Sequence, residues 1–151
     1  MNPPFFAEVF VKGDPKAQPR TKAARRGNFV SMYTPDTAKQ WRSEVAAALV
    51  EHHNREILCP VRIHIILYFR RPKSHHGTGR NSAILKPSAP RYHLQKPDVD
   101  NCAKAIMDVL SQNKNGIGLW KDDTQVVNLT IEKQWANGES GARITINEIT
   151  P

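Results

Sequence analysis

The sequence has 151 residues, a formal net charge of +8 and an isoelectric point of about 9.8, which is typical of one basic domain large enough to bury a core without disulfide or metal staples. No apolar run approaches about 18 residues and the N-terminus has no signal-peptide pattern, so we expect neither a membrane-spanning helix nor secretion. The two cysteines, Cys59 and Cys102, lack metal-site spacing, which favours a reduced, cytoplasmic protein.

The chain opens with a predicted strand over residues 5–12, where β-forming residues end at the turn signal Gly13-Asp14-Pro15. A basic loop over 12–33 follows, in which Asp14 is the one acidic residue. Such a loop is either a solvated surface segment or an arm that contacts nucleic-acid phosphates. The residues that we assign to DNA binding in this loop are Arg20, Arg25 and Arg26.

A helix is expected next, because Thr34 can act as its cap and Pro35 suits the first helical position. Its apolar stripe runs to about Glu51, and we interpret Trp41 on this stripe as a core residue rather than a base-stacking platform. Residues 60–70 then alternate between apolar and polar side chains, which predicts a half-buried strand.

Residues 70–96 show little periodicity and contain no acidic residue. Long loops inside a compact domain are usually functional or disordered. We interpret this one as a nucleic-acid-binding flap, with a solvated linker as the alternative. The residues that we assign to DNA binding in it are Arg70, Arg71, Lys73, Arg80, Lys86 and Lys96.

The stretch from Lys96 to Val127 carries the candidate chemistry. Apolar residues recur three and four apart from Val99 to Leu110, which predicts a helix with one buried face. Pro97 biases the residue before it toward an extended conformation, so this helix cannot begin much earlier. Asp98 and Asp100 therefore lie at a junction between loop and helix, where their carboxylates can converge.

These two acids and the later pair Asp122-Asp123 suit a hard divalent cation. Mg²⁺ prefers a few carboxylate oxygens and takes waters and substrate phosphate oxygens as its other ligands. Helix capping is the alternative role for an acid at a helix start, but a cap needs only one carboxylate. The strand alternation does not decide between Asp122 and Asp123, because the bend into the strand is unknown.

The distribution of charge is uneven along the chain. Residues 1–96 contain 17 Lys and Arg against 6 Asp and Glu, whereas residues 97–151 contain 5 against 8. An acidic site within a basic protein suits a metal-dependent enzyme that acts on a polyanion. Solubility alone is the alternative explanation of a basic isoelectric point.

The C-terminal part predicts a strand after Asp123, a turn at residues 135–138 and a return strand over 143–147 that closes a hairpin. The order strand, helix, strand, helix, strand, strand predicts a single α+β domain over residues 1–151. We expect a mixed sheet with the helices packed on it.

Several motifs carry a family resemblance. They are Lys96-Pro97-Asp98-Val99-Asp100-Asn101, with Lys104 and Met107-Asp108-Val109-Leu110 after it, and Trp120-Lys121-Asp122-Asp123-Thr124-Gln125-Val126-Val127. Together they resemble the RusA family of Holliday junction resolvases, particularly its phage and prophage members. The likeness covers nearly the whole chain, and its most specific part is the two aspartate blocks in this order.

The resemblance implies a RusA-like fold and a homodimeric, Mg²⁺-dependent endonuclease, with Mn²⁺ as a possible substitute, that cuts four-way DNA junctions by paired incisions in recombination and repair. It implies a phage or prophage protein acting in the bacterial cytoplasm, without a membrane or a small-molecule cofactor. It also implies that Asp98, Asp100 and Asp123 are the essential metal-binding carboxylates and that Lys104 is the essential lysine, with Asp122 as a supporting candidate.

Two other functions remain open from the residues. The chain is alternatively a non-catalytic basic module that binds nucleic acid, with structural acids, or a Mg²⁺ nuclease for other branched DNA. Lys104 is alternatively a partner of Asp100 or Asp108 in an ion pair one helical turn away.

Overall fold

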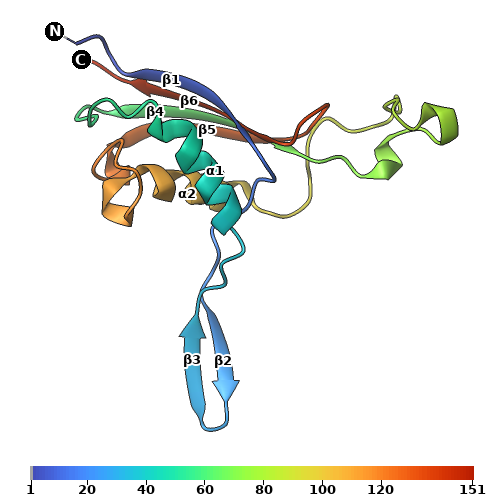
Figure 1. Cartoon of the computed structure of the whole chain (residues 1–151), viewed down its shortest axis with the longest axis horizontal. Coiled ribbons are helices and arrows are strands. Elements are labelled where there is room, and N and C mark those ends of the chain that lie inside the picture. The colour runs from blue at the N-terminus through green and yellow to red at the C-terminus, as the bar shows by residue number, and fades with distance from the viewer. Residues whose placement is uncertain (1) are drawn as a thin grey trace.

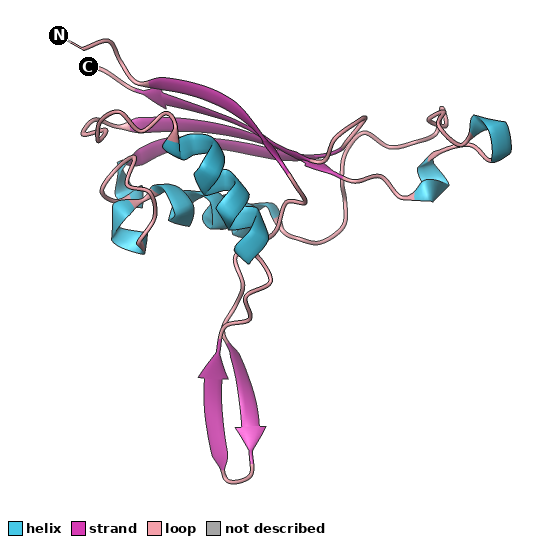
Figure 2. Cartoon of the chain, viewed as in Figure 1, coloured by secondary structure: helices cyan, strands magenta, loops and turns pink. Residues whose placement is uncertain are grey.

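The computed structural model describes residues 2–151 and contains a four-stranded sheet in the order β1-β6-β4-β5. Two helices, α1 and α2, cover one face of this sheet (Figure 1). A separate two-stranded hairpin of β2 and β3 stands off the body (Figure 2). The elements are β1 (Phe6–Lys12), β2 (Lys22–Arg26), β3 (Phe29–Tyr33), α1 (Lys39–Val50), β4 (Val61–Phe69), α2 (Val99–Leu110), β5 (Val126–Trp135) and β6 (Gly141–Glu148).

The core lies between the sheet and the two helices. Strand β4 is the centre of the sheet, and its alternate residues from Val61 to Phe69 are buried against the helices, as the sequence pattern predicts. Trp41 of α1 and Cys102 of α2 are buried in the same core, which confirms the core assignment of Trp41. The α+β architecture with a mixed sheet is therefore confirmed.

Strands β4 and β5 are parallel neighbours, so the chain between them must cross over the sheet. Helix α2 makes this crossover and packs against both α1 and β5. Its bounds agree with the helix expected from the apolar stripe. The crossover places the acidic face of α2 beside the chain that leads into β5.

Three sequence-based expectations are wrong in detail. Strands β5 and β6 do not form a hairpin, because β4 lies between them and pairs with β5 along one edge and with β6 along the other. The order of elements also includes two unexpected strands, since residues 22–33 of the predicted basic loop form a hairpin. Helix α1 begins at Lys39, one turn later than expected, because Thr34 instead contacts Thr21 through their hydroxyl groups at 3.0 Å, at the base of that hairpin.

Residues 70–96 form an arm that extends from one end of the sheet (Figure 1). The arm contains two short 3-10 turns, η1 (Lys73–His75) and η2 (Gly79–Asn81). A bridge between His76 and Leu85 pairs its two halves. Within residues 2–151, no helix combines the length and the apolar character needed to cross a bilayer.

Candidate functional site

A groove of about 700 Å³ lies between α2 and the segment that leads into β5. It contains four acidic side chains and two lysines beside an apolar floor. The two predicted site regions, at the start of α2 and before β5, therefore meet at one place. The lining residues are Val99, Asp100, Ala103, Lys104, Met107, Asp108, Asn113, Lys114, Asp122, Asp123, Thr124, Leu129 and Ile131.

Helix α2 contributes Asp100, Lys104 and Asp108 at successive turns of one face. The rise of an α-helix separates Asp100 from Asp108 by about 12 Å along the axis, with Lys104 midway. Lys104 is exposed and has no salt-bridge partner among residues 2–151. The alternative ion pair with Asp100 or Asp108 is therefore not formed, and the ammonium group is free in the groove.

The second wall contains a short 3-10 turn, η4 (Asp123–Gln125), capped by Asp122. The backbone N–H of Thr124 and the side-chain amide of Asn113 each donate to Asp122 at 2.9 Å. These hydrogen bonds, the backbone one first, lower the pKa of Asp122. Asp122 thus has a structural role at the start of β5.

Asp123 has a different hydrogen-bond partner. The indole Nε1–H of Trp120, which is fully buried, donates to Asp123 Oδ1 at 3.2 Å. This bond fixes the orientation of a half-buried carboxylate at the groove wall. The structure therefore distinguishes the two neighbouring aspartates, which the strand alternation could not do.

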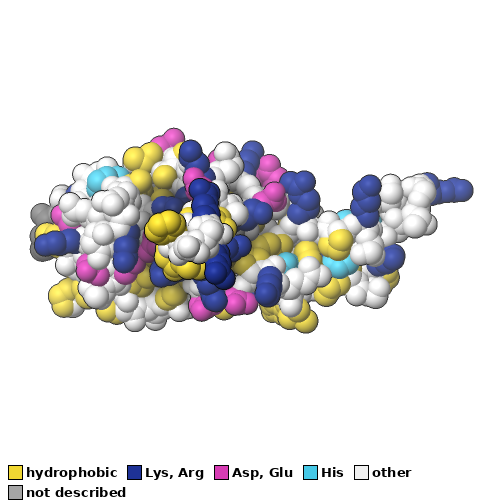
Figure 3. Space-filling view, turned by 90° about the horizontal axis from the view of Figure 1, so that it is seen from below, with side chains coloured by type: hydrophobic (Ala, Val, Ile, Leu, Met, Phe, Trp, Pro, Cys, Tyr) yellow, Lys and Arg dark blue, Asp and Glu magenta, His cyan; other side chains and the backbone are white. Residues whose placement is uncertain are grey.

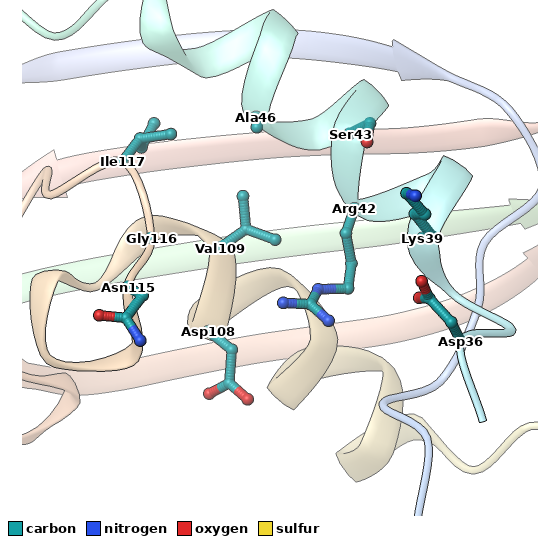
Figure 4. Close-up of a pocket in the computed structure, with 10 residues that line it drawn as sticks. All are labelled: Asp36, Lys39, Arg42, Ser43, Ala46, Asp108, Val109, Asn115, Gly116 and Ile117. Carbon is teal, nitrogen blue, oxygen red and sulfur yellow. The ribbon is translucent and has the colours of Figure 1, made fainter. Parts of the chain in front are cut away.

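Asp108 is the most buried acid of the groove, with 7% of its surface exposed. Burial raises its pKa, and the negative charge of Asp123 raises it further. Its Oδ1 atom is buried and has no hydrogen-bond partner among the described residues. Figure 4 shows the Asp108 side chain pointing away from α1, while Arg42 reaches from α1 toward α2. No salt bridge joins these two side chains.

Asp98 lies outside this groove. It occupies the N-cap position of α2, is exposed, and makes no side-chain cap hydrogen bond. The turn before it is tied to β5, because Lys133 Nζ donates to the carbonyls of Gln95 at 2.7 Å and Pro97 at 2.8 Å. Within residues 2–151, no three His, Cys, Asp or Glu side chains are close enough to bind one ion together.

The hairpin of β2 and β3 presents two of the predicted DNA-binding residues, Arg25 and Arg26, on exposed strand positions. In its register Arg26 lies opposite Phe29 and Lys22 lies opposite Tyr33, so these four side chains share one face. Phe29 is 79% exposed. Seen along the hairpin in Figure 3, Lys and Arg side chains lie beside hydrophobic ones.

The arm carries most of the other predicted DNA-binding residues, and one of them has an internal role. Arg71 donates from Nε to the Ala136 carbonyl at 3.0 Å, from Nη1 to the Pro90 carbonyl at 2.7 Å and from Nη2 to Asn137 Oδ1 at 3.0 Å. Arg70 is exposed and forms a salt bridge with Asp14 at 3.6 Å. The remaining predicted residues, all exposed, are Arg20, Lys73, Arg80, Lys86 and Lys96.

Sequence reasoning did not assign a site role to four of the residues described above, Asp108, Phe29, Tyr33 and Trp120. Asp108 had a usable signal, because it is an acid among the buried positions of an amphipathic helix. The aromatic face of the hairpin also had one, since the turn pair Gly27-Asn28 directly precedes the β-forming segment Phe29–Tyr33. The role of Trp120 as a donor to Asp123 had no local signal, because it depends on folding.

Comparison with known proteins adds an independent finding. The sequence matches the family described as Endodeoxyribonuclease RusA over residues 12–147. It is also similar to a protein of Bacillus subtilis (strain 168) named "Uncharacterized protein YqaN". The two are 30% identical over 146 residues, which cover 93% of this chain and 94% of the relative.

Proposed function

The chain belongs to the RusA family of endodeoxyribonucleases, and from this premise we propose that it is a Mg²⁺-dependent endonuclease that resolves four-way DNA junctions. It would act in recombination and repair in the cytoplasm of a bacterial cell, encoded by a phage or prophage. A bacterial relative that matches over nearly its whole length supports the bacterial setting. The observation that carries the proposal is the groove that four aspartates line together with Lys104, which forms no salt bridge among the described residues.

The donor set of the groove fits magnesium. Its carboxylate oxygens are hard ligands, and one of them, Asp108 Oδ1, is buried without a partner. Mg²⁺ commonly uses only one or two carboxylates in addition to waters and substrate phosphates, so it does not require three clustered acids. We assign Asp100 and Asp123 as metal ligands, and we keep Asp98 as a ligand proposed from the family resemblance.

Magnesium, when bound, supplies charge stabilisation for the scissile phosphate and lowers the pKa of a water molecule. The chain's own residues supply further charge stabilisation and position the carboxylates. Lys104 offsets the negative charge that develops on the phosphate in the transition state. Trp120 holds Asp123 in place through its indole N–H, and Lys133 fixes the turn that precedes Asp98.

The hairpin and the arm supply the DNA contacts in this proposal. Their Lys and Arg side chains attract phosphates, and residues 70–96 contain no acidic residue to oppose this attraction. On the hairpin, Phe29 and Tyr33 add exposed aromatic rings next to cations, a combination that binds unpaired or distorted nucleic acid by stacking.

A homodimer fits the substrate, because a four-way junction has approximate two-fold symmetry and paired cuts require two active sites. Strand β5 is an edge of the sheet and exposes Val127 at 61% and Leu129 at 41%. Val99 of α2, exposed at 37%, lies on the same groove as Leu129. An apolar sheet edge of this kind favours a second copy as its partner.

The test uses purified protein and four labelled substrates, namely a four-way junction, a flap, a duplex and a single strand, each with Mg²⁺ or EDTA. We expect paired cuts in the junction with Mg²⁺ and none with EDTA. Cutting of all substrates to the same extent would instead indicate a general nuclease. Tight junction binding without any cutting would indicate the non-catalytic binding module.

A further inference from the structure

Asp108 is an acid whose position is difficult to explain by stability alone. Only 7% of its surface is exposed, and its Oδ1 atom has no hydrogen-bond partner among the described residues. A buried carboxylate without a partner opposes folding, because it has lost its hydration. Asp108 lines the groove and also borders the adjoining cavity of about 390 Å³, and a buried polar atom without a partner at such a place is explained by a ligand that binds there.

A second acid lies close to it on the facing wall. Asp108 and Asp123 line the same groove, and the negative charge of Asp123 adds to burial in raising the pKa of Asp108. Neither residue has a salt-bridge partner within residues 2–151. The bond from Trp120 engages only Oδ1 of Asp123, so its second oxygen is free for another partner. The two negative charges repel each other, and Lys104, Lys114 and Arg42 offset this repulsion without forming a salt bridge to either acid.

We infer that Asp108 and Asp123 together bind the divalent cation of the groove, with Asp108 as a ligand that the aspartate motifs at residues 98–100 and 122–123 do not include. This inference deepens the proposed function and rests on it. Two carboxylates with waters and a substrate phosphate complete the usual environment of Mg²⁺. Asp100 lies about 12 Å from Asp108 along the helix axis, so it is not a ligand of this ion, and with Asp123 it would hold a second one. Asp122 is excluded from this pair, because its oxygens are engaged by Thr124 and Asn113.

The decisive experiment measures Mn²⁺ binding to the full-length, metal-free protein without DNA, by the electron paramagnetic resonance signal of free Mn²⁺. Asp108→Asn and Asp123→Asn should each weaken the affinity at least about tenfold. The double variant should bind little more weakly than either single variant, because both act on one ion. Asp36→Asn is the matched control, because Asp36 lines the neighbouring cavity of about 390 Å³ and not the groove (Figure 4). The Mn²⁺ affinity of this variant should stay within about twofold of that of the wild type.

Thermal unfolding separates a metal ligand from a structural residue. In EDTA, Asp108→Asn should have a melting temperature equal to or above that of the wild type, since it removes an unpartnered buried charge. With Mg²⁺, the wild type should gain more stability than the variant. A variant that is less stable in EDTA, or that retains Mn²⁺ affinity within about twofold, would overturn the inference.

The wild type itself offers a measurement that does not depend on any variant folding. Addition of Mg²⁺ should shift the side-chain carboxyl ¹³C resonances of Asp108 and Asp123 together, and an unshifted Asp108 resonance would overturn the inference. The outcome is distinguishable from that of the junction assay. A protein that cuts junctions but shows no Asp108 effect retains the proposed function, whereas one that binds metal through Asp108 but cuts nothing loses it.

Discussion

Two carboxylates with little exposed surface, Glu148 and Asp108, differ in their partners. Glu148 accepts from Arg55 Nη2 at 2.6 Å and from the backbone N–H of Phe5 at 2.8 Å. The side-chain hydrogen bond from Arg55, followed by that from Phe5, lowers the pKa of Glu148 to about 2. Asp108 has no salt-bridge partner among the described residues, and burial raises its pKa.

The difference shows how a fold uses the same chemical group in two ways. At Glu148 a paired carboxylate joins the N-terminal segment to the last strand, so its charge stabilises the native state. At the groove Asp108 and Asp123 form no salt bridge among the described residues, so burial and mutual repulsion oppose the charge on Asp108 until a cation binds. Stability and activity should therefore separate between these two regions.

The largest expected effect tests this separation through activity. Asp100→Asn removes a proposed metal ligand and should reduce junction cleavage in Mg²⁺ at least about a hundredfold. Junction binding should change little, because in the proposed function the hairpin and the arm supply the phosphate contacts. Cleavage rate and gel-shift affinity on the same junction give the two readouts. Near-wild-type cleavage would contradict the assignment of Asp100.

A substitution at Glu148 tests the same separation through stability. Glu148→Gln leaves the Arg55 guanidinium without its carboxylate and should lower the free energy of unfolding by about 2 kcal/mol. Urea denaturation followed by circular dichroism measures this loss. Cleavage per folded molecule should be unchanged, which makes this variant the counterpart of Asp100→Asn. A stability equal to that of the wild type would remove the contrast between the two regions.

Acid titration sharpens the same comparison. The pKa of Glu148 is lower in the folded state than its ordinary value of 4.5, so its stabilising contribution is complete above about pH 4.5 and is lost as the pH falls toward 2. Over this range the wild type should lose roughly 1 to 2 kcal/mol more stability than Glu148→Gln. Urea midpoints at pH 5, 4 and 3 give the comparison. Parallel curves for the two proteins would contradict it.

The smallest effect concerns Asp122, an acid that lines the groove but has partners of its own. Asp122→Ala removes the cap of η4 and should lower the free energy of unfolding by about 1 kcal/mol. Cleavage should fall much less than in Asp100→Asn, because Asp122 does not bind metal. A cleavage loss as large as that of Asp100→Asn would move Asp122 into the metal site.

The sequence predicted those parts of the molecule that depend on local periodicity. The bounds of α2 followed from its apolar stripe, and the central strand followed from its alternation. The pairing of β6 with β4 rather than β5 could not be predicted, because strand order depends on contacts distant in the chain. The hairpin was missed because its many basic residues obscured the Gly27-Asn28 turn, where Gly27 has a φ of 63°.

The candidate site was likewise predicted where it depends on local motifs and missed where it depends on contacts distant in the chain. The motifs identified Asp100, Lys104 and Asp123, which the fold brings to one groove. They did not indicate that Asp122 is engaged as a cap or that Asp108 lines the same groove as Asp123, since both facts depend on the path of the chain between α2 and β5. The position of Asp98 outside the groove likewise could not be inferred from spacing alone.

The hydrogen bonds of Arg71 have a consequence for the arm that begins beside it. One guanidinium joins the start of the arm to Pro90 near its end and to the connection that follows β5. The arm is therefore a loop already closed at its base, and the entropy of closure depends only weakly on how many residues lie beyond that closure. Insertions or deletions at its tip would change how far the arm extends from the sheet and leave the spacing of the carboxylates as it is.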